Sequence, residues 1–153
     1  MRFLHLVVGG IVFVVFLSTG GYMQNRFPGI YHGNEAIRMM FRANHIYILL
    51  AALLNLGMGC YLVARAAGWR RRLQWLGSLL ILVCTGLLVA AFYQEPMRGS
   101  FERPLTVAGI FFLFVGTTLH LISSLPPRGR ARAAEAEQSV RGKEKQEAFA
   151  GKR

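Results

Sequence analysis

Four long stretches without a charged residue constrain this chain more than any other feature. They cover residues 3–19, 46–64, 73–93 and 105–125, and each has 17 to 21 residues. About 20 helical residues, rising roughly 1.5 Å each, cross a hydrocarbon core of about 30 Å. A hydrophobic fraction of 54% agrees with this reading. The sequence therefore predicts an all-α integral membrane protein of four spans, and short links between the spans favour an up-and-down bundle.

The segments around these stretches define the predicted organisation. Residues 20–45 form an outer loop to about Gly33 and then a helical extension, which begins near Asn34, a residue type suited to an N-cap. The transmembrane domain comprises residues 1–127. Residues 128–153 are rich in Ala, Arg, Glu, Lys and Gln, and predict a disordered basic tail. The first stretch is also compatible with a cleaved signal peptide, because small residues follow it.

The positions of the basic residues predict the orientation in the membrane. Arg65 and residues 70–72 lie in the link between the second and third spans, and eight further basic residues follow the fourth span. The positive-inside rule places both regions, and therefore both termini, in the cytoplasm. Fifteen Arg against three Lys is typical of a GC-rich bacterial genome, so we expect a bacterial inner-membrane protein. The chain has a net charge of +11, and the positions of its basic residues favour binding to membrane lipids over binding to nucleic acid.

A charged stripe leads into the second span. Its members are spaced three or four residues apart and so share one helix face: Glu35, Arg38, Arg42 and His45. They are compatible with an interfacial collar whose arginines reach lipid phosphates. Glu95 and Glu102, on the other outer loop, could instead neutralise the arginines and form an ion network between the loops. The third interpretation is a ligand site for a carboxylate, a phosphate or a quinone carbonyl, groups that arginine binds bidentately.

Three polar residues within the spans are candidates for interior roles. Asn55 is the most polar residue deep in a span, and we expect it to hydrogen-bond a neighbouring helix. His5 and His120 lie about one turn from the cytoplasmic ends of the first and fourth spans, and therefore at nearly one level. Two facing imidazoles at one level are what axial ligation of a b-type haem requires. A quinone bound beside one of them is an alternative, as is simple capping of a helix end.

Motifs for other chemistry are absent from the sequence. His32, Glu35 and His45 on the outer side do not have the dense spacing of a metal site, and we expect no metal. The sequence has no nucleophile elbow, P-loop or dinucleotide-binding fingerprint. All seven acidic residues are Glu outside the spans, which disfavours a proton-coupled transporter.

These observations favour a non-enzymatic accessory or interaction subunit, acting through helix packing and its outer Arg/Glu/His rim. Its expected partners are membrane lipids, together with another membrane protein or a second copy of the chain. The first alternative is an electron-transfer subunit that binds haem b or quinone through His5 and His120. The second alternative is a channel or carrier for small anions.

Overall fold

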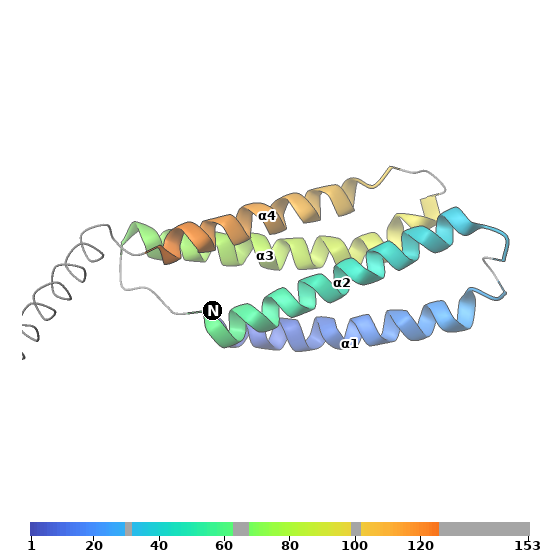
Figure 1. Ribbon diagram of the computed structural model, residues 1–153, viewed down its shortest axis with the longest axis horizontal. Coiled ribbons are helices and arrows are strands. Elements are labelled where there is room, and N and C mark those ends of the chain that lie inside the picture. Colours follow the sequence, from blue (N-terminus) through green and yellow to red (C-terminus); the bar gives the residue numbers. More distant parts are fainter. Residues whose placement is uncertain (30–31, 63–67, 99–101, 126–153) are drawn as a thin grey trace, which may run out of the picture. The chain divides into compact units, whose positions relative to one another are not determined.

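The computed structural model describes residues 1–29, 32–62, 68–98 and 102–125. In this part of the chain there are four α-helices, a short 3-10 helix and no strand (Figure 1). Their bounds are α1 (Arg2–Arg26), α2 (Glu35–Tyr61), α3 (Trp69–Gln94), η1 (Pro96–Arg98) and α4 (Pro104–Ser124). All four α-helices are long and apolar enough to cross a membrane. The predicted fold class, a four-helix membrane bundle, is confirmed; Arg65 and the predicted tail at 128–153 lie outside the described residues.

The first two helices, α1 and α2, run antiparallel, as contacts at both ends of the pair show. At the start of α1, the Arg2 guanidinium donates to the carbonyl oxygens of Gly59 and Cys60 near the end of α2. At the other end of the pair, Phe27 packs against Phe41 with ring centroids 5.9 Å apart. The first two helices therefore form a tight hairpin (Figure 1).

Two groups of side chains form the interior. The first joins α1, α2 and α3 and consists of Val12, Phe27, Phe41, Ile48, Ala52 and Phe92. The second joins α2 and α3 through Ala51, Cys84 and Leu88, and α4 packs on it through Phe112 and Leu113. Large apolar side chains such as Phe114 remain exposed, as expected for a surface facing lipid.

Glycine permits the closest helix contacts. A methyl group at Gly77 would lie 2.9 Å from the backbone oxygen of Gly116 and 2.8 Å from the ring of His120. At Gly9 in α1, it would lie 2.8 Å from the backbone nitrogen of Leu56 in α2. Small residues at these points let the backbones approach closely, which is the usual way helices pack in lipid.

The outer loop is shorter than the sequence predicts, because α1 continues through Gly20 and ends at Arg26. Gly20 lies against the His45 ring, where a methyl group would be 3.4 Å from Cε1. Tyr22 beyond it packs against the aromatic core. These tertiary contacts offset the low helix propensity of glycine. On the other side of the loop, Asn34 caps α2 by accepting a hydrogen bond from the Ile37 amide at 3.2 Å.

Candidate functional site

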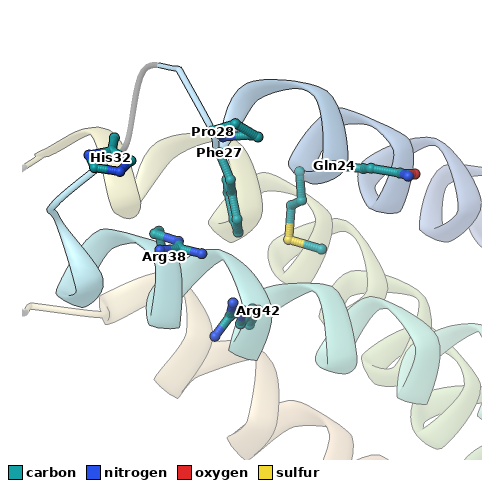
Figure 2. A pocket seen from close by; sticks show the side chains of 7 residues that line it. Gln24, Phe27, Pro28, His32, Arg38 and Arg42 are labelled. Carbon is teal, nitrogen blue, oxygen red and sulfur yellow. The ribbon is translucent and has the colours of Figure 1, made fainter.

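An open pocket of about 460 Å³ lies where α1 ends and α2 begins. Its lining residues come from both helices and the segment between them: Met23, Gln24, Phe27, Pro28, His32, Arg38 and Arg42. Figure 2 shows Arg38 and Arg42 extending from α2 while the Phe27 ring reaches toward them from the end of α1. We refer to this cavity as the rim pocket. It combines an apolar wall with two guanidinium groups.

Arg38 is held within the rim pocket by two contacts. Its Nη1 donates to Glu35 Oε1 at 2.7 Å, one turn earlier on the same helix. Its guanidinium carbon lies 5.6 Å from the centroid of the Phe27 ring, within the range of a cation–π interaction. Nε of Arg38 is buried and has no hydrogen-bond acceptor among the residues that the structure describes. The side chain is thus positioned, although its buried Nε lacks a partner in the described part of the chain.

Arg42 is less constrained. It is exposed, and among the described residues it makes no hydrogen bond or ion pair. His32, also exposed, lies on the loop side of the same pocket. With one carboxylate already bonded to Arg38, the rim pocket has an excess of positive charge.

His45, the fourth member of the predicted stripe, does not line the rim pocket. Its ring stacks on Phe16 of α1, with centroids 4.1 Å apart and an interplanar angle of 18°. Nδ1 lies 2.9 Å from Thr19 Oγ1, whose own hydroxyl donates to the Phe16 carbonyl. The imidazole therefore donates to Thr19 and joins α1 to α2.

Glu95 occupies a separate cluster between α2, α3 and α4, which we call the Glu95 cluster. The carboxylate is fully buried, accepts from the Thr106 amide at 2.8 Å and from the Thr106 hydroxyl at 2.5 Å, and lies 3.5 Å from Arg103 Nε. Asn44 donates to the carbonyl oxygen of Ala91 at 2.9 Å and accepts from Arg103. The cluster ties the start of α4 to the ends of its neighbours.

The two loop carboxylates named by the sequence thus lie in different surroundings. Glu95 pairs with Arg103, eight residues further along the chain, and not with Arg38 or Arg42 of the stripe. Glu102 is exposed, and no hydrogen bond or ion pair joins it to another described residue. The predicted network between the two outer loops is therefore not formed through these two carboxylates in the described residues.

Asn55 is the centre of an interior hydrogen-bond chain. Its amide nitrogen donates to the Ala51 carbonyl at 2.9 Å and to Thr85 Oγ1 at 2.8 Å, while the Thr85 hydroxyl donates to Ile81. The Asn55 oxygen therefore faces His5 Nδ1, at 2.8 Å, and His5 donates this bond. His5 is fully buried, and its Nε2 has no partner in the part of the chain that the structure describes.

His120 contacts α3 directly. Its Nε2 lies 3.2 Å from Ser78 Oγ, and its ring packs against Gly77. Among the residues that the structure describes, no three His, Cys, Asp or Glu side chains gather as metal ligands would.

Several residues of these sites were not singled out from the sequence. They are Phe27, Asn44 and Arg103. The position of Asn44 could have been predicted from the sequence. It precedes Asn55 by eleven residues, or about three helical turns, and so lies on the same buried face of α2. The position of Arg103 could not have been, because one arginine before a helix start is compatible with simple solvation.

Fold and sites together define a multi-pass membrane protein of the four-helix type with a cationic pocket at one end. Comparison of the chain with protein families, characterised proteins and solved structures gives no match.

Proposed function

We propose that this chain is a non-enzymatic accessory or interaction subunit of a bacterial inner membrane, with both termini in the cytoplasm. The basic residues 70–72, in the first turn of α3, support the orientation through the positive-inside rule. In this orientation the rim pocket and the Glu95 cluster belong to the outer end. The subunit would act through that rim and through its packed helices.

The observation that carries the proposal is the contrast between a closed interior and an open, charged rim. Polar groups between the helices are engaged with one another, as in the Asn55 chain and the Glu95 cluster. Arg42 and Glu102 at the rim are exposed and make no such bonds among the described residues. Arginine beside aromatic and methionine side chains is enriched in surfaces that bind partners.

Site-specific photo-crosslinking in living cells tests this role. A photoreactive residue at Met39, which is 66% exposed at the rim, should give one discrete protein adduct, and Arg42→Glu should abolish it. The matched position is Phe114, 71% exposed on α4 away from the rim, where no discrete adduct is expected. Equal crosslinking at both positions, or none at Met39, would contradict the proposal.

One observation favours a second candidate, the electron-transfer subunit. The unpartnered Nε2 of His5, with Nδ1 oriented by an amide oxygen, resembles the arrangement of imidazoles that ligate metals. Haem ligation by both histidines would require His120 to leave Ser78 and the surface of Gly77. A visible spectrum of protein purified from haem-replete cells separates the candidates. A Soret band in the parent protein that is lost in His5→Ala favours the electron-transfer subunit. A colourless preparation excludes haem.

A further inference from the structure

The rim pocket has the features of a ligand site and not only of a charged surface. It is concave, and its volume of about 460 Å³ falls within the usual range of small-molecule sites. Its wall is apolar on the α1 side, through Met23, Phe27 and Pro28, and cationic on the α2 side, through Arg38 and Arg42 (Figure 2). A complementary ligand therefore has a hydrocarbon part beside an anionic part.

The hydrogen-bond donors of the pocket favour an oxyanion. Neither Arg42 nor the buried Nε of Arg38 has a hydrogen-bond acceptor among the described residues. Glu35, bonded to Arg38 at 2.7 Å, compensates only one of the two charges. A guanidinium presents its donors in a planar fork that matches the oxygens of phosphate and carboxylate. An oxyanion in the pocket would accept from Arg42 and compensate the remaining positive charge.

The position of the pocket along the helices identifies the source of this oxyanion. Arg42 precedes the uncharged stretch of α2 by four residues, and the lining residues of α1 follow its most apolar part. In a membrane-spanning bundle, this level coincides with the lipid headgroups, where phosphates lie beside the glycerol and the first acyl carbons. A phospholipid supplies the oxyanion and the hydrocarbon in one molecule.

We propose that the rim pocket binds the headgroup phosphate of an anionic phospholipid, with Arg38 and Arg42 on its oxygens and Phe27 and Met23 against its hydrocarbon. This inference deepens the proposed function and rests on it for the location of the rim in the headgroup layer. It differs from a general collar of arginines in lipid, because it requires one site of defined stoichiometry.

The test is binding of a short-chain phosphatidylglycerol to the delipidated full chain in a neutral detergent, followed by native mass spectrometry. We expect saturation at one lipid per chain, and a loss of affinity of about tenfold or more in Arg42→Gln. The matched control is Arg98→Gln. Arg98 is also exposed, but it lies after α3 and is not part of the pocket lining. Its variant should bind like the parent chain.

Inorganic phosphate, added as a competitor, distinguishes the two sources of the oxyanion. Competition only at far higher concentration than the lipid supports the headgroup, whereas equal affinity would overturn it in favour of a free anion. Lipid binding that does not saturate at one per chain, or that is unchanged in Arg42→Gln, would overturn the site itself. An acidic peptide that displaces the lipid at equal concentration would also overturn the assignment.

The two proposals can fail separately. If the Met39 crosslink persists while phosphatidylglycerol does not bind, the lipid site fails and the accessory role stands. If the lipid binds through Arg42 and no protein adduct forms at Met39, the accessory role fails and the lipid site stands.

Discussion

Two arginine sites in this protein have opposite surroundings. Arg103 contacts the buried carboxylate of Glu95 and shares hydrogen bonds with Asn44 and Thr106. Arg42 lines an open cavity and has no acceptor among the described residues. In the first case the chain itself supplies the anion, whereas in the second the described residues supply none.

The difference teaches which charge stabilises the fold and which is available for binding. A buried carboxylate left without its donors is costly, so Glu95 and its neighbours depend on one another. An exposed guanidinium is hydrated and contributes little to stability, typically less than about 1 kcal/mol even when paired. We therefore expect the Glu95 cluster to respond to mutation as structure and the rim pocket to respond as a binding site.

Glu95→Ala should have the largest effect on folding. It removes the acceptor of the Thr106 amide and hydroxyl and leaves Arg103 without its carboxylate, which should lower the free energy of unfolding by about 2–4 kcal/mol. The measurement is reversible unfolding in mixed detergent micelles. Glu102→Ala, a change at an exposed carboxylate, is the control and should stay within about 0.5 kcal/mol. Equal losses of unfolding free energy in both variants would contradict the distinction between the buried, hydrogen-bonded carboxylate and the exposed one.

A second comparison, between a closely packed position and an open one, uses two glycines of α3. In Gly77→Ala, the new methyl group would lie under 3.0 Å from Gly116 and His120, and we expect a loss of about 1–3 kcal/mol. Gly86 is exposed and has open space around it, so Gly86→Ala should leave stability unchanged or raise it by up to about 1 kcal/mol. Unfolding of the two variants under one condition gives the comparison. A stable Gly77→Ala would mean that α3 and α4 are less closely packed.

A smaller loss is expected when the interior hydrogen-bond chain is broken. Asn55→Ala removes the bonds to His5 and Thr85, and hydrogen bonds between helices in a membrane contribute about 0.5–2 kcal/mol. Thr117→Val is the control, because Thr117 is exposed and bonds only within its own helix. Both changes are measured by the same unfolding assay. Equal free energies of unfolding for the two variants would show that the hydrogen bonds of Asn55 contribute nothing to stability.

The sequence predicted the fold because its main determinant is local. Each span needs only an apolar stretch of sufficient length, and both Asn34 and Pro104 marked helix starts by their own backbone chemistry. The length of α1 was not predictable in this way. Its continuation past Gly20 depends on Phe27 and Tyr22 meeting α2 and α3, which are contacts between distant segments.

The sites were less accessible to sequence reasoning for the same physical reason. Helical spacing places Arg38, Arg42 and His45 on one face, but it does not say which neighbour each side chain meets. A turn beyond Arg42, the face meets α1, and Phe16 and Thr19 engage His45 there. The partner of Glu95 depends on how α4 is placed against α3, and the spacing of charges along the chain does not contain that information.

The most direct test of this division is the free energy of unfolding of Arg103→Gln beside that of Arg42→Gln, measured under one condition. Both variants remove one guanidinium and add the same amide. We predict a loss of at least about 1 kcal/mol for Arg103→Gln, because Glu95 remains buried without its cation, and no measurable change for Arg42→Gln. Equal losses, or a larger loss for Arg42→Gln, would contradict the account.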